Sequence, residues 1–549
     1  MTGIRSTPKA TLSAINYVSV VTHYRNGTQD GEQIKAVLVT NHTDFNYTSG
    51  TNSFALVKLE KASKTNSYEL QRVSLEVWDN EDCSRFFAID DTMVCAGGTV
   101  ASAQGTYQNN LHLFAIMAVA SVSDAVRSDA THTKLPDEQV RQTLTRDYST
   151  LRFRIEYHNF FSNHLLHAVV ALHELGASER KITDYATFYA QKLEEEGSDH
   201  EDVVEHPSTI DILSDEEAQA LLGKRYNYDA LLAYYARDVK KLGADGAVRK
   251  HLPHLFGGLA GALLHGLIQL GYAYHIGGDR LVAEGLAYQH HCYLSFDEPP
   301  MEPSKEPLRV LTRQEAVKVA AAVTSNEFLL SEQDRLMSTS PLKEMDIGWI
   351  QRGVNAFSAH PERNSRAAFE LIWSQINAFD FSRFDGCYAL DMIMWLYTMI
   401  DHNDFTVLHA VTSAWSLQQL EHLLSPSDCA KAWRVWLHVA LSALVTARIH
   451  DFYEEDVCSP SGDLEERLAA LPSWSQLRDK ALAIPGFPDE HVYKMVQVAD
   501  AHANGDYHTE GAMSGYVPFL SREERDFVAR TAALKVIDIP FKSIINQPK

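Results

Sequence analysis

Histidines inside apolar, helix-like stretches constrain the fold of this chain more than any other feature of its sequence. The run from Leu255 to His291 is apolar on almost every side and rich in glycine and alanine, which predicts buried helix. This run nevertheless carries His265 and Gln269 one turn apart, followed by His275, His290 and His291. Because a buried imidazole needs a hydrogen-bond partner or a metal ion, the core must provide one.

Three further apolar stretches, far apart in the sequence, show the same combination. They carry, in chain order, His164 with His167, then His409, then His491 with Lys494. We expect all four stretches to be helices that converge, with their histidines facing one another around a metal ion. The spacing of three residues places His164 and His167 on one face of a helix.

Each of these patterns also has a simpler explanation. With 25 histidines among 549 residues, short histidine motifs arise by chance, and an isolated buried pair is more often a satisfied part of the core. His491 and Lys494 also fit an exposed helix start that has Asp489 and Glu490 at its positive end. A cationic Lys494 would repel a metal ion, whereas a buried neutral amine reacts with carbon dioxide to give an anionic carbamate ligand. The residue pattern leaves this choice open.

The overall charge of the chain argues against several classes of partner. The formal net charge of -23 disfavours nucleic acid or an anionic membrane as the main partner. The first residues lack the apolar run of a signal peptide, and the 255–291 run is too interrupted for a membrane helix. Six cysteines in a chain of this length do not form a disulfide framework. We therefore expect a cytoplasmic protein without a membrane segment.

Residues 17–98 differ from everything that follows them in the spacing of their apolar residues. Short alternating runs such as IKAVLV, FALVKLE and LQRVSLEVW are separated by Asn, Gly, Thr and Ser, which predicts strands and turns. Together with YVSVVTHYRNG and NEDCSRFFAIDDTMVCAGG, these runs resemble a truncated chymotrypsin-like serine protease. The resemblance is greatest to the secreted and often inactive homologues of oomycetes.

This resemblance implies a segment without protease activity. Ser53 stands where the family has its triad aspartate, and His42 does not match the triad histidine, whose segment is missing. The glycine-rich serine loop is missing as well, so no triad member is present and no nucleophile can be activated. Cys83 and Cys95 match a pair that the family joins as a disulfide, although a reducing cytosol would keep both thiols free.

From about residue 111 onward the apolar period is helical, and no strand alternation is long enough to build a sheet. We therefore predict a mainly α fold, with a multi-helical domain over residues 106–549 after a small truncated β-rich segment over residues 1–105. The proline-rich run 296–308 is expected to be a loop. No H-E-x-x-H, P-loop or G-x-G-x-x-G motif occurs, and the E-x-x-H pairs of a di-iron bundle are missing where they would be needed.

Several pieces of the helical part resemble the questin oxidase-like family, in the family's order and with similar spacing. They are FFSNHLLHAVVALHELGAS, GGLAGALLHGLIQLGYAYHI, LVAEGLA, FTVLHAVTSAWSL and DEHVYKMV, within residues 107–549. The resemblance implies an all-helical oxidoreductase. The family includes fungal oxidases that open anthraquinone rings and a relative with a Baeyer–Villiger-type role. One member is understood as a non-haem iron dioxygenase whose iron is held by four histidines and a carboxylated lysine.

Carried onto this sequence, the resemblance implies an iron site made of His164, His265, His409, His491 and Lys494. His167 is the alternative to His164, or a base beside the iron. The sequence departs from the family at Gln269, where relatives often have histidine, and at His275, where an acidic residue is common. Both differences affect the substrate pocket or its proton transfers, and neither removes an implied ligand.

We therefore hypothesise a mononuclear iron (Fe2+) oxidase or dioxygenase that acts with dioxygen on an aromatic polyketide or quinone-like substrate. His167 would be the catalytic base, and Gln269 and Trp415 would bind the flat substrate, although buried aromatic residues are more often plain core. One alternative is NADPH-dependent, metal-free Baeyer–Villiger oxidation in the same fold. Another is a non-catalytic protein that binds a partner through its protease-like head.

Overall fold

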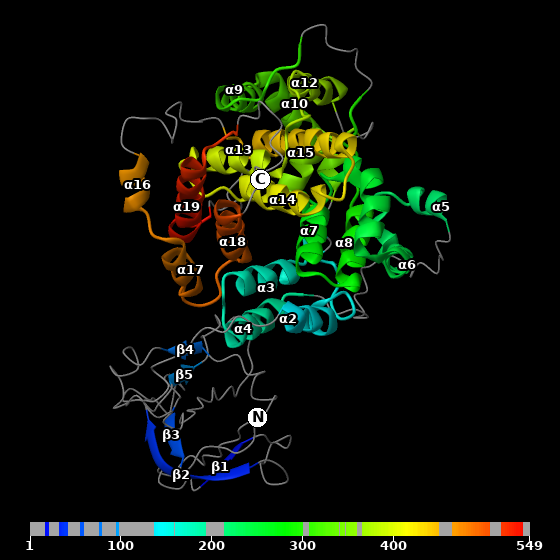
Figure 1. Ribbon diagram of the computed structural model, residues 1–549. Helices are drawn as coiled ribbons and strands as arrows, with labels where there is room; N and C mark the ends of the chain where they lie inside the picture. The colour runs from blue at the N-terminus through cyan, green and yellow to red at the C-terminus, as the bar shows by residue number, and fades with distance from the viewer. Residues whose placement is uncertain are drawn as a thin grey trace. The chain divides into compact units, whose positions relative to one another are not determined.

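The computed structural model describes five short strands (17–20, 32–41, 55–59, 76–78 and 95–97) and residues 137–158, 160–193, 214–299, 307–339, 341–345, 347–359, 365–449, 464–505 and 518–541. The chain divides into two compact units, Met1–Thr131 and His132–Lys549 (Figure 1). Residues 98–136 lie outside the described ones, so the predicted boundary after residue 105 and the helix expected from residue 111 stay predictions.

The N-terminal unit contains strands, as the alternating runs predict. β1 (Tyr17–Val20) pairs antiparallel with β2 (Glu32–Asn41), which pairs antiparallel with β3 (Ala55–Leu59). β4 (Glu76–Trp78) and β5 (Cys95–Gly97) form a second antiparallel pair. Ser53, His42 and Cys83 lie outside the described residues, as does the side chain of Cys95, so the disulfide candidate stays a prediction.

The C-terminal unit consists of helices, which confirms the predicted mainly α fold. In the part of this unit that the structure describes, the strands are β6 (Glu156–Tyr157) and β7 (Phe161–Ser162), which form a short hairpin. Its α-helices are α2 (Asp137–Thr143), α3 (Leu165–Glu174), α4 (Glu179–Ala190), α5 (Asp215–Gln219), α6 (Tyr228–Leu255), α7 (His265–Ile276), α8 (Asp279–His291), α9 (Arg313–Thr324), α10 (Glu327–Met337), α11 (Trp349–Asn355), α12 (Arg366–Ile376), α13 (Gly386–Thr398), α14 (Phe405–Glu421), α15 (Pro426–Thr446), α16 (Leu464–Ala470), α17 (Trp474–Leu482), α18 (Glu490–Asn504) and α19 (Arg522–Asp538).

The run 255–291 is buried as predicted, but it is not continuous helix. After α6 ends, the backbone passes through a left-handed turn in which Ala262, Leu263 and Leu264 have φ of 47°, 55° and 68°. This conformation costs roughly 1–2 kcal/mol per non-glycine residue, and α7 begins directly after it. Gly277 and Gly278, with φ of 81° and 109°, then reverse the chain into α8. The apolar pattern hides both breaks because the residues between the helices are nearly all buried.

α7 and α14 form the centre of the unit, and nearly all of their residues are buried. A Cβ on Gly271 of α7 would lie 2.3 Å from the Cβ of Ser416 in α14, so the glycine allows the two helices to approach closely. α3 and α18 contact each other, and both pack against this central pair. The four histidine-bearing stretches, distant in sequence, therefore lie together (Figure 1).

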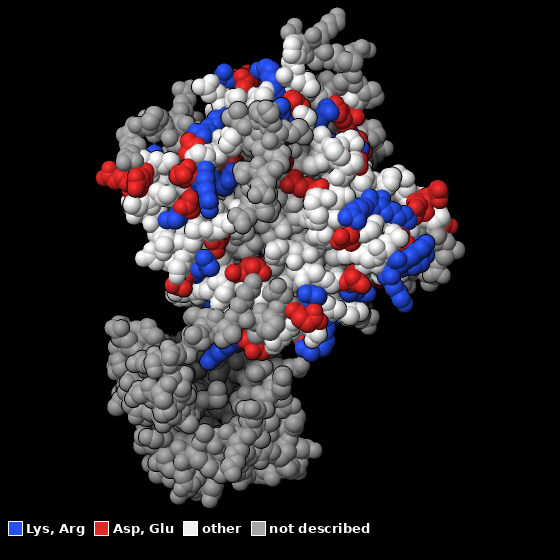
Figure 2. All heavy atoms as spheres, viewed as in Figure 1, with Lys and Arg blue, Asp and Glu red and all other residues white. Residues whose placement is uncertain are grey.

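The surface, the loops and the lengths of the helices add three observations. On the visible face of the C-terminal unit, the described basic and acidic side chains alternate without a continuous basic area (Figure 2). The described ends of the proline-rich run, 296–299 and 307–308, carry neither helix nor strand, in agreement with the predicted loop. Among the residues that the structure describes, no helix is long and apolar enough to cross a bilayer.

Candidate metal centre

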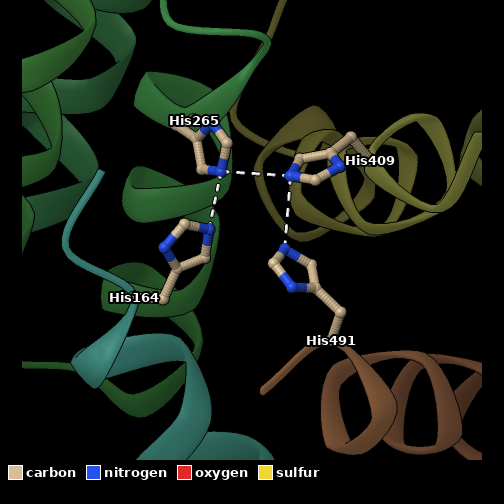
Figure 3. A group of neighbouring side chains, drawn as sticks. All are labelled: His164, His265, His409 and His491. Carbon is tan, nitrogen blue, oxygen red and sulfur yellow. Dashed lines mark hydrogen bonds between the residues drawn. The ribbon is translucent and has the colours of Figure 1, made fainter. Parts of the chain in front are cut away.

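Four histidine rings meet where α3, α7, α14 and α18 come together (Figure 3). His164 is the N-cap residue of α3, His265 is the first residue of α7, and His409 and His491 lie near the starts of α14 and α18. The rings are buried, and one nitrogen from each lies within 4.8 Å of the others. Successive Nε2 atoms are separated by 2.7 Å (His164 to His265), 3.2 Å (His265 to His409) and 3.3 Å (His409 to His491).

The second ring nitrogen, Nδ1, faces an oxygen in every case. These contacts are His164 with the Ser162 carbonyl at 2.6 Å, His409 with the Phe405 carbonyl at 2.7 Å, His491 with the Asp489 carboxylate at 2.6 Å, and His265 with the Ala262 carbonyl. A carbonyl or an ionised carboxylate accepts hydrogen bonds and has no proton to give. Each Nδ1 is therefore the donor, and in a neutral ring Nε2 is left as a bare acceptor.

Four acceptor nitrogens thus point at one another with no proton between them, an arrangement that a bound cation would stabilise. Burial, reinforced by neighbouring histidines and Lys494, holds the pKa values of His164 and His409 well below the ordinary range. Burial and the nearby Lys494 lower the pKa of His265 to about 3. Neutral imidazoles whose Nδ1–H is held by an oxygen are the usual form of histidine at a metal ion.

Lys494 lies one turn after His491 on α18 and is fully buried, with a relative exposure of 0%. Its Nζ has no hydrogen-bond partner among the described residues. Burial lowers the pKa of this amine to about 8, against the opposing effect of Glu490 and Asp489. A buried amine near its neutral form is the state that can react with carbon dioxide, and it interacts electrostatically with three of the clustered rings.

The start of α18 is only in part the exposed helix end that the sequence also allowed, because Asp489 is exposed whereas His491 and Lys494 are buried. Glu490 is buried, and Tyr189 donates a hydrogen bond to its Oε1 at 3.4 Å. Asp489 caps the helix by accepting from the backbone N–H of His491 at 3.0 Å, as well as from its ring. The carboxylate that looked like an ordinary helix cap therefore also fixes the orientation of an imidazole.

His167 and Gln269 lie beside this cluster. The His167 ring is 5.4 Å from that of His164, and neither of its nitrogens has a well-aligned hydrogen-bond partner among the described residues. The Oε1 atom of Gln269 is likewise buried without a well-aligned partner among the described residues, and hydrogen bonding to Gln269 opposes the larger lowering of the His167 pKa by burial. His167 is outside the group of four whose nitrogens converge, and its predicted roles, as the alternative to His164 or as a base beside the metal, stay predictions.

Trp415 is buried one layer further out. Its ring lies 4.6 Å from Tyr272 and 5.1 Å from His275, and the Tyr272 hydroxyl donates to Gln497 at 2.9 Å. His275 is partly exposed, and its Nε2 lies 3.7 Å from the carboxylate of Glu174. These contacts are those of a core aromatic residue, and the predicted stacking of Trp415 on substrate remains a prediction.

A hydrogen-bond network that the sequence did not predict surrounds Ser162, whose carbonyl accepts from His164. The Ser162 hydroxyl contacts the Tyr288 hydroxyl at 2.6 Å, and Tyr288 also donates to Glu156 at 3.0 Å. Arg225 pairs with Glu156 and holds the pKa of this buried carboxyl at about 2 although burial raises it. Among the acceptors that hold the four Nδ1 atoms, only Asp489, two residues before His491, is a side chain that a reader could pick out in the sequence. The other three are backbone carbonyls, which every residue has.

The strands of the N-terminal unit belong to a region with curated relatives. "Glucanase inhibitor protein 3" of Phytophthora infestans is 47% identical over an alignment of 116 positions. The match covers 15% of this chain and 45% of the relative. "Glucanase inhibitor protein 2" of the same organism is 48% identical over 115 residues, and its namesake in Phytophthora sojae is 41% identical over 117 residues. The chain spans less than half the length of these relatives. The expected likeness to degenerate serine protease homologues is confirmed.

The helical part matches a family model described as questin oxidase-like over residues 161–499. This match begins at the hairpin before α3, ends within α18, and so includes every element that brings a histidine to the cluster. Since the model covers more than half of the sequence, and the helices that it covers form the centre of the fold, the chain belongs to the questin oxidase-like family.

Proposed function

We propose that the helical unit is a non-haem iron oxygenase that oxidises an aromatic, quinone-like substrate with dioxygen. Membership of an oxidase-like family indicates an oxidoreductase in the broad sense. The observation that supports the finer proposal is the convergence of four buried Nε2 atoms, one from each of four histidines at the starts of four helices.

The donor set fits a divalent transition metal. Neutral imidazoles suit zinc, copper, iron and nickel, and an oxidase needs an ion that changes its redox state, which zinc does not do. His164, His265, His409 and His491 would hold the ion. Lys494 would add an anionic oxygen after its amine attacks carbon dioxide, forming an N–C bond and releasing one proton. When bound, iron supplies the one-electron chemistry with dioxygen that protein side chains lack.

The residues around the cluster would bind the substrate, exclude water and move a proton. The buried helices α7 and α14 shield the site from solvent. His167 has ring nitrogens without aligned partners, so one of them can accept the proton of a phenolic hydroxyl and make the substrate ring more electron-rich. Gln269 Oε1 can accept a hydrogen bond from a second hydroxyl, and Trp415 would form an apolar wall behind the site.

Elemental analysis of the purified full chain tests the metal. We expect roughly one iron per chain in the wild type and a loss of most of it in the His265→Ala and His409→Ala variants, since each removes one of the buried donors. His438→Gln is the matched control, because His438 is a buried histidine packed among Phe296, Phe369 and Trp373. Wild-type protein that neither contains nor takes up iron would refute the proposal.

Activity assays separate this proposal from its two competitors. Oxygen uptake with hydroxylated anthraquinones that stops on chelation supports the iron oxygenase. NADPH consumption that survives chelation would point instead to metal-free Baeyer–Villiger oxidation. The likeness of the N-terminal unit to glucanase inhibitors favours a second candidate, a binding role for this unit. A pull-down of a β-glucanase by the purified full-length His265→Ala variant, which is expected to lack metal, tests it.

A further inference from the structure

Glu490, the first residue of α18, is a buried carboxylate that lies behind two of the four clustered rings. Its Oε1 atom is 3.7 Å from Nδ1 of His164 and 4.0 Å from Nδ1 of His491. Both ring nitrogens already contact nearer oxygens at 2.6 Å. Glu490 therefore acts on the two rings through its charge, and not as their hydrogen-bond partner.

His164 and His491 are the two ends of the cluster. The Nε2 contacts run from His164 through His265 and His409 to His491 (Figure 3). The rings of the first and the last histidine lie 4.9 Å apart, and they come from different helices, α3 and α18. A carboxylate behind this pair therefore links the two rings that must approach each other to complete the set of four nitrogens.

Tyr189 of α4 holds Glu490 in this position. Its hydroxyl donates to Oε1 of Glu490 at 3.4 Å and accepts from the backbone N–H of His164 at 3.1 Å. Tyr157 is a further hydrogen-bonding neighbour of the same hydroxyl. Tyr185, one turn earlier on α4, donates to a backbone carbonyl just before α18. Because α4 bonds to the starts of both α3 and α18, it fixes the ends of the cluster relative to each other, although it contributes no ring to the four.

Lys192, just after the end of α4, faces the other oxygen of Glu490. Its Nζ lies 3.8 Å from Oε2 of Glu490 and 3.9 Å from the centre of the Tyr189 ring. The lysine side chain is 43% exposed, so solvent screens its charge. Lys192 therefore offsets only part of the negative charge that Glu490 presents to the rings.

From these contacts we infer that Glu490, held by Tyr189, is a positioning residue of the metal centre, which keeps His164 and His491 together and strengthens the binding of a divalent cation through its negative charge. The inference rests on the proposed function only in requiring that the four rings hold a metal ion. Carboxylates behind histidine ligands typically account for about 10–100-fold in metal affinity. A role limited to packing or to hydrogen bonding would not depend on charge.

Zinc titration of the chelated full chain, in competition with a chelator of known affinity, measures the effect of the charge. Glu490→Gln keeps the shape of the side chain and an oxygen for Tyr189, and it should weaken zinc binding by about 10–100-fold. Glu490→Asp keeps the charge on a shorter side chain. It should bind zinc within about threefold of the wild type, because the attraction falls only as the inverse of distance. Tighter zinc binding by Glu490→Gln than by Glu490→Asp would overturn the inference, since shape would then matter more than charge.

Two control variants separate this charge from other effects. Glu284→Gln neutralises a carboxylate of α8 that is 1% exposed and bonds to Thr150 and Arg280, and it should bind zinc like the wild type. Lys192→Met removes the opposing charge and should bind zinc at least as tightly as the wild type. A loss as large as that of Glu490→Gln in either control would overturn the role of charge at Glu490. Titration at about pH 8.5 keeps Lys494, whose pKa burial lowers to about 8, mostly neutral throughout.

Tyr189 should act together with Glu490. Tyr189→Phe should weaken zinc binding by about tenfold. The double variant Tyr189→Phe/Glu490→Gln should lose less than the product of the two single losses, because residues that act as one unit are not additive. A loss equal to that product would overturn the pairing of the two residues. Wild-type protein that binds neither zinc nor iron would overturn the proposed function as well, whereas equal zinc binding by wild type and a folded Glu490→Gln variant would overturn this inference alone.

Discussion

Nε2 of His164 lies 2.7 Å from Nε2 of His265, although both rings donate hydrogen bonds from Nδ1 to backbone carbonyls. The closest contact in the cluster is therefore one between two acceptors, and it stands in a buried setting where such a contact is costly. A cation placed between the two nitrogens turns this unfavourable contact into two favourable ones.

Metal binding should consequently stabilise the folded protein, in addition to its proposed role in the oxidation reaction. At a free metal concentration of 100 times Kd, binding to the folded state alone adds about 2.7 kcal/mol. For a large unit this corresponds to a rise in Tm of a few degrees. Differential scanning fluorimetry of chelated protein, with and without added Fe(II) under anaerobic conditions, measures the rise. It should vanish in His265→Ala, and a chelated protein that melts at the same temperature as the loaded protein would contradict the expectation.

Asp489 should matter through the ring of His491 more than through its helix cap. Asp489→Ala removes the carboxylate that holds Nδ1 and should weaken metal affinity by roughly 10–100-fold. Asp404→Ala is the matched control, because Asp404 caps α14 by accepting from Thr406 and Val407 at 2.8 Å and 3.0 Å while His409 bonds to a carbonyl instead. Both variants lose a cap worth about 1 kcal/mol. Only Asp489→Ala should lose metal in a competition titration. Equal losses of metal in the two variants would mean that Asp489 acts only as a helix cap.

The Lys494→Met variant tests whether Lys494 has a structural role or a role in binding the metal. Methionine matches the length of the side chain and removes a buried polar atom that has no partner among the described residues, so the free energy of unfolding of the metal-free protein should stay the same or rise slightly. If Lys494 supplies a carbamate oxygen, the variant should lose metal affinity and oxidase activity. Carbon-13 NMR with labelled bicarbonate should show a carbamate signal in the wild type that is missing in Lys494→Met. A variant with full activity would remove Lys494 from the proposed site.

Much of the fold and of the cluster could be predicted from the sequence because both rest on apolar periodicity. Histidines at His265 and His409 stand out against buried helices, and the helices that carry them pack together in the structure. The left-handed turn at Ala262–Leu264 could not be predicted, because alanine and leucine give no signal for positive φ. That turn starts α7 at His265 and presents the Ala262 carbonyl to its ring.

The hydrogen-bond acceptors around the rings could not be predicted either. Backbone carbonyls such as that of Phe405 are equally present at every residue, and only the folded geometry selects which one meets an imidazole. Long-range partners such as Glu156 and Tyr288 are 132 residues apart in the chain, and a single sequence holds no record of such a pairing.

Buried neutral histidines should make the metal-free protein sensitive to acid, and His438 offers the clearest case because it lies outside the cluster. Burial among aromatic rings lowers its pKa to about 3 in the folded state, against an unfolded value near 6.5. Between these two values the unfolded chain binds the extra proton, so the free energy of unfolding must fall as the pH decreases from 6.5 toward 3. One such histidine contributes a slope of up to about 1.4 kcal/mol per pH unit. Urea unfolding of chelated wild type and His438→Gln across this range should show a shallower slope in the variant, and parallel slopes would mean that His438 is protonated in the folded protein.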